Sequence, residues 1–140
     1  MPLDAQQKAM LKQAIGMTDA DANKVGPNIQ KILARFPDFQ KYQFVAEVVD
    51  AKYCFAGVKK GQKYVFASAP PMILTDQSDC PLCLRALGPL TPILGTMMER
   101  VAEGLDPNPG VFQVAECLDP GLERGGLGKV VFRVYAQKAK

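Results

Sequence analysis

Segments with the composition of β-strands follow one another along this chain instead of alternating with helices. Residues 42–49 and 62–67 are rich in β-branched and aromatic side chains, residues 72–75 indicate a short third strand, and residues 111–116 and 129–136 predict two more. Strands that are segregated from helices in this way favour an α+β fold. We therefore expect a mostly antiparallel sheet or a small open barrel.

One long, interrupted helix is predicted between the third and fourth strands. Asp79 can cap a helix that opens with Cys80-Pro81 and runs to the break at Gly88-Pro89. The helix restarts after this break, and apolar residues recur at helical spacing until residue 104. This stripe predicts a core helix packed across the sheet rather than a methionine-rich cofactor site.

Residues 1–40 have a different character and form a helical preface. Helices are predicted over residues 5–15, after Thr18, and from Pro27 to a stop at Pro37. The preface has no cysteine and few apolar residues, so we interpret it as a cover or a partner-docking element and not as an independent domain. Residues 41–140 then form the α+β core domain.

Composition limits the location and the partners of the chain. No apolar run approaches the roughly 20 residues that a membrane helix needs, and the N-terminus lacks the pattern of a signal peptide. The net charge is only +3, and the basic residues are scattered. We therefore expect a cytoplasmic protein without a membrane or nucleic-acid partner, which associates with another protein or with a second copy of itself.

Histidine is absent from all 140 residues. Because histidine is the usual general base near neutral pH and the commonest metal ligand, Ser-His-Asp and Cys-His catalysis, histidine-containing zinc sites and two-histidine iron sites are excluded. A soft-metal site in this chain must therefore depend on thiolates.

The chain has four cysteines, each next to the boundary of a predicted element. Cys80 and Cys83 form a Cys-Pro-Leu-Cys motif at the predicted helix start, Cys54 follows the first strand, and Cys117 follows the fourth. If these two strands run parallel to each other, both thiols reach one end of the sheet, where the helix start can join them. Cys83 shares a helix face with Leu87, so it is the cysteine that we most expect in the core.

Three interpretations of the cysteines stay open. In the first, Cys54, Cys80 and Cys117, with Cys83 as a further ligand, bind a zinc ion or an iron–sulfur cluster. In the second, Cys80 is a redox thiol or a nucleophile whose pKa is lowered at a helix start. In the third, the cysteines are small hydrophobic residues of the core, as free cysteines often are.

Two carboxylates lie close to the cysteines in the sequence. Asp79 precedes Cys80, and Asp119 lies two positions after Cys117. Both are candidate catalytic proton acceptors, although acids in polar loops more often cap helices and turns. Residues 124–129 are rich in glycine but lack P-loop spacing, so they predict a hairpin connection whose N–H groups can still bind an anion.

A pattern extends over all these segments. It consists of Cys-x-Ala-Gly-x-Lys-x-Gly from Cys54, Cys-Pro at Cys80, Cys-x-Asp from Cys117 and Gly-Gly-x-Gly from Gly125. In this pattern the chain resembles a family of small uncharacterised bacterial and archaeal proteins found mostly in anaerobes, although Val58 stands where members usually have histidine. The resemblance implies that Cys54, Cys80 and Cys117 act together, with Cys83 as an extra, and it implies no activity.

From the sequence we predict a small protein with a cysteine site, which binds zinc or an iron–sulfur cluster and is accessory to a larger metabolic enzyme. A thiol enzyme that uses the Cys-Pro-Leu-Cys motif is one alternative. A metal-free interaction module that docks through residues 1–40 is the other.

Overall fold

A computed structural model describes residues 2–140, which divide after Pro37 into two compact units. The first unit contains helices α1 (Ala5–Ile15), α2 (Asp19–Ala22) and α3 (Pro27–Ala34). Asp4 and Gln7 form a capping box on α1, and Thr18 caps α2. The helix predicted from Pro27 ends at Ala34, before Pro37, and a separate short helix, α4 (Phe36–Phe39), includes this proline in its first turn, where its missing N–H costs nothing.

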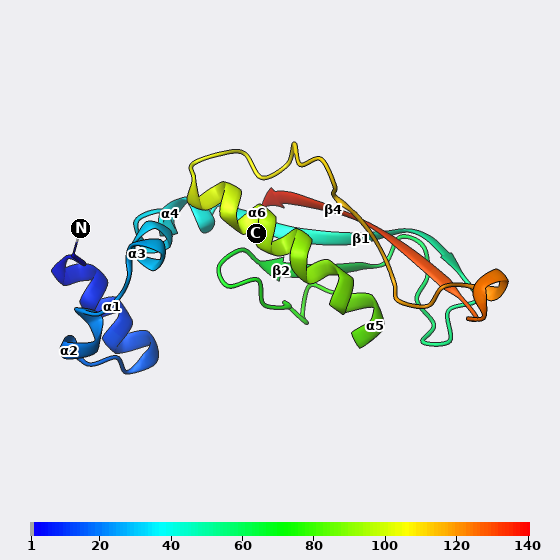
Figure 1. Cartoon of the computed structure of the whole chain (residues 1–140), viewed down its shortest axis with the longest axis horizontal. Helices are drawn as coiled ribbons and strands as arrows, with labels where there is room; N and C mark the ends of the chain where they lie inside the picture. Colours follow the sequence, from blue (N-terminus) through cyan, green and yellow to red (C-terminus); the bar gives the residue numbers. More distant parts are fainter. Residues whose placement is uncertain (1) are drawn as a thin grey trace. The chain divides into compact units, whose positions relative to one another are not determined.

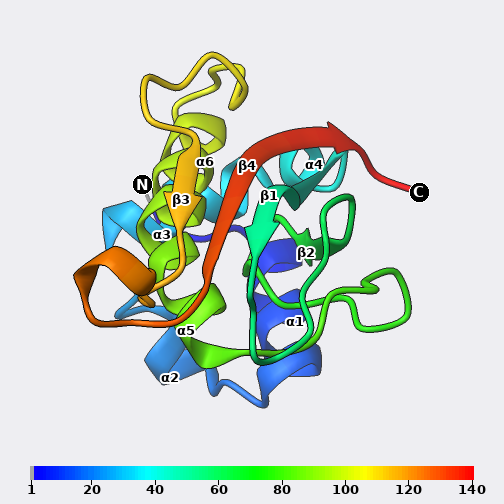
Figure 2. The same cartoon turned by 90° about the vertical axis from the view of Figure 1, so that its right-hand side faces the viewer.

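The second unit is built on a four-stranded antiparallel sheet with the strand order β2-β1-β4-β3 (Figure 2). Its strands are β1 (Tyr42–Lys52), β2 (Lys63–Ala67), β3 (Val114–Glu116) and β4 (Lys129–Lys138). The two long strands are central and pair from Tyr42 opposite Lys138 to Lys52 opposite Lys129. The predicted α+β class with an open antiparallel sheet is therefore confirmed.

The predicted interrupted helix is also present in this unit. It consists of α5 (Leu84–Leu87), the 3₁₀ turn η1 (Gly88–Leu90) and α6 (Thr91–Ala102). Both views show it running along one face of the sheet (Figures 1 and 2). The helix buries a stripe of apolar residues at helical spacing, namely Leu90, Leu94, Met97 and Val101.

The sheet contributes alternate residues of β1 and β4 to this core. Phe44 lies opposite Ala136 and Val48 lies opposite Phe132, and all four side chains are buried. Because side chains alternate between the two faces of a strand, this register places these four side chains on one face.

Residues 72–75 do not form the predicted third strand. A single bridge joins Ile73 to Phe66, since Pro70 and Pro71 have no N–H to donate and the Ser78 hydroxyl accepts the bond from Val65 N at 2.8 Å. The segment nevertheless covers the free edge of β2.

Strand β3 is shorter than predicted and begins at Val114. The preceding Gln113 side chain accepts a bond from Gly110 N at 2.9 Å and donates one to Pro107 O at 3.2 Å, which folds this loop on itself. No helix in the described part of the chain has the length and apolar character needed to span a membrane.

Candidate functional site

Cys54 and Cys117 lie at the same end of the sheet. Strands β1 and β3 both pair antiparallel with β4, so they run parallel to each other. Cys54 comes two residues after the end of β1, and Cys117 directly follows β3. The strand direction that the sequence left open is therefore the one that brings these two thiols together.

A tight turn at Tyr53 separates Cys54 from β1. Tyr53 has a φ of 52°, a left-handed conformation that is uncommon for a bulky residue. Gly128, which directly precedes β4, packs closely against this turn. A Cβ added to Gly128 would lie 2.3 Å from the Tyr53 carbonyl oxygen. Beyond the turn, Tyr53 and Cys54 line two different pockets.

The segment that contains Cys80 and Cys83 is not helical, so the prediction of a helix that opens at Cys80 is wrong. Helix α5 begins at Leu84, and Cys83 is its N-cap residue with an extended backbone. Long-range hydrogen bonds explain why the helix begins later in the chain than predicted. The N–H group of Cys80 donates to the Lys63 carbonyl at 3.2 Å, which ties the segment to β2.

Tyr64 completes this attachment from the core. Its side chain is fully buried against Phe132, with ring centroids 5.6 Å apart, and its hydroxyl donates to the Pro81 carbonyl. Burial, as the main cause, raises the pKa of Tyr64, so the hydroxyl remains a donor at neutral pH.

Three of the four cysteines line one pocket of about 200 Å³, which we call the thiol pocket. They are Cys54 from the loop after β1, Cys83 from the start of α5 and Cys117 from the end of β3. The apolar part of the wall comes from Phe55, Ala56, Val58, Ala86 and Val130. Segments about 30 residues apart in the chain are thus brought to one apolar cavity.

Backbone bonds hold two walls of the thiol pocket together. Leu118 N donates to the Arg85 carbonyl at 3.1 Å, which joins the end of β3 to α5. Cys117 N donates to Val130 O at 2.9 Å, and Val130 N donates to Cys117 Sγ at 3.3 Å. The Cys117 sulfur therefore already accepts one hydrogen bond.

Cys80 is buried next to the thiol pocket and does not line it. Burial is the main cause that raises the pKa of the Cys80 thiol, and negative charge on Asp79, Cys54 or Cys83 raises it further. This direction is opposite to the low pKa predicted for a helix-start nucleophile. Cys83, which we expected in the core, is half-buried and lines the pocket instead.

Asp119 lines the thiol pocket, and its carboxylate organises the glycine-rich loop. Its carboxylate accepts N–H bonds from Gly121 at 3.0 Å, Leu127 at 2.9 Å and Gly128 at 2.9 Å. These bonds, that of Gly121 first, lower the pKa of Asp119 below its ordinary value. Two of the N–H groups that we expected to be able to bind an anion, those of Leu127 and Gly128, are thus already bound to a carboxylate of the same chain.

Asp79, the other candidate proton acceptor, has a comparable structural role. Its carboxylate accepts a bond from Lys63 N at 2.7 Å, which ties the residue to the start of β2. Both acids that the sequence offered as catalytic candidates are therefore engaged by backbone N–H groups. Asp119 lines the thiol pocket, but its carboxylate already accepts three backbone N–H bonds.

Among residues 2–140, no three cysteine, aspartate or glutamate side chains are arranged as a ligand set for a metal ion. The structure thus brings Cys54, Cys83 and Cys117 to one cavity without arranging them around a metal ion. The trio suggested by the family resemblance is divided, because Cys54 and Cys117 line the pocket while Cys80 lies behind it.

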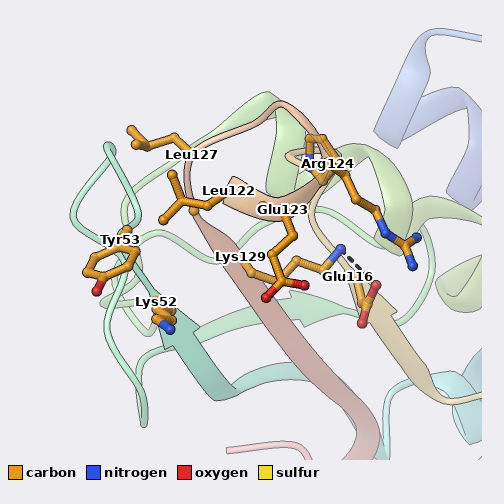
Figure 3. A pocket seen from close by; sticks show the side chains of 11 residues that line it. Lys52, Tyr53, Glu116, Leu122, Glu123, Arg124, Leu127 and Lys129 are labelled. Carbon is orange, nitrogen blue, oxygen red and sulfur yellow. Dashed lines mark ion pairs between the residues drawn. The ribbon is translucent and has the colours of Figure 1, made fainter.

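A second pocket of about 450 Å³ shares Gly128 and Lys129 with the thiol pocket. The Lys129 amine lies 2.9 Å from the neighbouring Glu116 carboxylate, and Tyr53 lies away from this ion pair, on the other side of the pocket (Figure 3). Because acidic and basic side chains alternate around this pocket, its charge selects no ligand class.

Sequence reasoning missed Arg85 and Lys129, which place two cations on the wall of the thiol pocket. The only available signal for Arg85 was its position two residues after Cys83. The chain matches no protein-family model, no curated protein and no solved structure.

Proposed function

We propose that the thiol pocket binds a soft metal ion, zinc in the first place, through the thiolates of Cys54, Cys83 and Cys117. The observation that carries this proposal is the convergence of three cysteines, from three separate segments, on one apolar pocket of about 200 Å³. Thiolates are preferred ligands of zinc and of iron–sulfur clusters, and this chain has no histidine as an alternative.

Metal binding requires the thiols to turn toward a common point. A cysteine sulfur changes its position by rotation about a single bond, χ1, which has three staggered states. Cys54 and Cys83 are half-buried, and their thiols make no hydrogen bond within residues 2–140. Cys117 Sγ can keep the bond that it accepts from Val130 N, but on losing its proton it must give up the weak bond that it donates to Asp119 O at 3.8 Å. Cys80 is the candidate for a fourth ligand, because it lies close enough to Cys54 and Cys83 for negative charge on them to raise its pKa.

We propose an accessory role for such a site and no catalytic one. Catalysis by a thiol or a metal-bound water requires a proton acceptor nearby, and Asp79 and Asp119 are both held by backbone N–H groups. The raised pKa of Cys80 also counts against the alternative of a Cys80-dependent enzyme. The larger metabolic enzyme that this protein would serve remains a prediction from the sequence.

Zinc competition under anaerobic conditions tests the proposal. We expect one zinc ion per full-length chain, and we expect Cys54→Ser, Cys83→Ser and Cys117→Ser each to weaken binding by about tenfold or more. Affinity should fall with decreasing pH, because thiolates must lose protons before they bind.

Cys80→Ala is the matched control for these variants. If Cys80 is at most a fourth ligand, its loss weakens zinc binding less than the loss of any pocket cysteine. Unchanged zinc affinity in all three pocket variants would exclude the thiol pocket as the metal site. Reconstitution with iron and sulfide in place of zinc distinguishes an iron–sulfur cluster from a mononuclear site.

A further inference from the structure

Each cysteine of the thiol pocket is followed directly by an exposed, large apolar side chain. Phe55 follows Cys54 and is 94% exposed, Leu84 follows Cys83 and is 84% exposed, and Leu118 follows Cys117 and is 65% exposed. We call these three residues the apolar rim. Phe55 lines the thiol pocket itself, and Leu84 and Leu118 each follow a cysteine that lines it. Single exposed apolar residues are common, but three on the segments that form one pocket indicate an interaction surface.

Positive charge flanks the apolar rim. Lys59 and Lys60 lie exposed on the same loop as Phe55, and neither makes a salt bridge within the described residues. Arg85 lies exposed next to Leu84, and its charge contributes to the lowered pKa of Asp119. An apolar centre with a charged border is the usual anatomy of a protein-binding surface.

We propose that the apolar rim docks a protein partner whose surface presents apolar side chains bordered by carboxylates. The apolar side chains of the partner would cover Phe55, Leu84 and Leu118, and its carboxylates would lie opposite Lys59, Lys60 and Arg85. This surface belongs to the α+β core, not to residues 1–40, where we expected docking from the sequence. The proposal does not depend on the presence of a metal in the pocket.

The charges favour a protein over the other macromolecules. Glu116 and Glu123 share the adjoining pocket with Lys52, Arg124 and Lys129, so acidic and basic side chains are mixed there, whereas the phosphates of a membrane or of RNA present negative charge alone. A protein surface can place cations opposite these two acids and carboxylates opposite the lysines. A second copy of this chain would instead bring Lys59, Lys60 and Arg85 against the same positive charges.

Site-specific photo-crosslinking in the producing cells tests the proposal, with the full chain carrying benzoyl-phenylalanine at position 55. The matched control carries the same probe at Phe112, which is 85% exposed and lies in the loop before β3. We expect a protein that is crosslinked from position 55 and not from position 112. Mass spectrometry identifies this protein, which is then purified.

Binding of the purified partner to the full-length chain completes the experiment. We expect Phe55→Ser, Leu84→Ser and the double variant Lys59→Glu/Lys60→Glu each to weaken binding by about tenfold or more, with Phe112→Ser unchanged. Binding should weaken with increasing salt. Cys117→Ser should retain the partner, so that failure of the metal site and failure of the docking surface are distinguishable.

Several outcomes would overturn the proposal. They are the absence of any crosslink specific to position 55, a crosslink to a second copy of the chain, and a partner that binds Phe55→Ser and Leu84→Ser as tightly as the native protein. Binding to RNA or to phosphatidylglycerol vesicles that is lost in Phe55→Ser would assign the surface to another class of ligand. Circular dichroism of each variant checks that the fold is retained.

Discussion

Gly128 lies against the backbone of Tyr53, so closely that a Cβ on Gly128 would be 2.3 Å from the Tyr53 carbonyl oxygen. This contact joins the start of β4 to the end of β1. Gly128 lines both pockets, whereas Tyr53 lines one and Cys54 the other. The position of Cys54 relative to Cys117 therefore depends on the absence of a side chain at residue 128.

Gly128→Ala should destabilise the protein by roughly 1–3 kcal/mol, because the obstructing atom belongs to the backbone and cannot turn away. Urea unfolding measures the change. Gly95→Ala is the control, since Gly95 lies in α6 with open space around its Cα, and alanine there should stabilise the helix by up to about 1 kcal/mol. A Gly128→Ala protein as stable as the native one would contradict the close contact.

Asp119→Asn should lower the urea midpoint at pH 7, because the amide replaces a carboxylate that accepts three backbone N–H bonds. These bonds lower the pKa of Asp119 in the folded state. Ionised Asp119 therefore stabilises the fold above its unfolded-state pKa of about 3.9, and this stabilisation is lost as the pH falls through the lower folded-state pKa.

Unfolding of the two proteins across pH checks this assignment. The difference between native and Asp119→Asn stability should be constant near neutral pH and should shrink below about pH 4. A difference that persists unchanged in strong acid would mean that the charge of Asp119 has no part in holding the loop.

Cys80 should be the slowest cysteine to react with iodoacetamide in the native protein. It is buried, and burial raises its pKa, so little thiolate is present at pH 7–8. Mass spectrometry of peptides after timed alkylation distinguishes it from Cys54, Cys83 and Cys117, which are half-buried. Preferential alkylation of Cys80 with an apparent pKa below about 8.5 would restore the enzyme hypothesis.

Tyr64→Phe should destabilise the protein by about 1 kcal/mol, because the ring stays stacked on Phe132 while the Pro81 carbonyl loses its donor. Tyr135→Phe is the matched control, since the Tyr135 hydroxyl donates to Glu47 at a half-exposed position. Urea unfolding compares the two. An equal loss of unfolding free energy in both variants would show that the Tyr64 hydrogen bond has no special part in holding the segment that contains Cys80 and Cys83.

The fold could be predicted largely from local signals in the sequence. Local signals include the capping residues of α1 and α2, Pro27 at the start of α3, and the β-branched and aromatic residues of β1 and β4. Each acts within a few residues of the element that it defines. The antiparallel sheet followed from the grouping of the strands. Residues 72–75 failed as a strand because a side-chain hydroxyl, that of Ser78, replaced a backbone partner.

The site was less predictable, because distant contacts decide its details. Helix α5 begins only at Leu84, because two long-range hydrogen bonds hold the preceding segment in an extended form. These are the bond from Cys80 N–H to the Lys63 carbonyl and the bond from the Tyr64 hydroxyl to the Pro81 carbonyl. No local propensity reports such bonds, so the sequence could not show that Cys83 would line the pocket and Cys80 would be buried. The sequence predicted that Cys54 and Cys117 would meet at one end of the sheet on the condition that β1 and β3 run parallel to each other, and they do.

The most direct measurement of the central claim is X-ray absorption at the zinc edge of the zinc-loaded, full-length protein. The proposal predicts a first shell dominated by sulfur at about 2.3 Å, with at least three sulfur ligands, and loss of sulfur neighbours in Cys54→Ser, Cys83→Ser and Cys117→Ser. A shell of only oxygen and nitrogen, or a protein that retains no zinc after gel filtration, would contradict it.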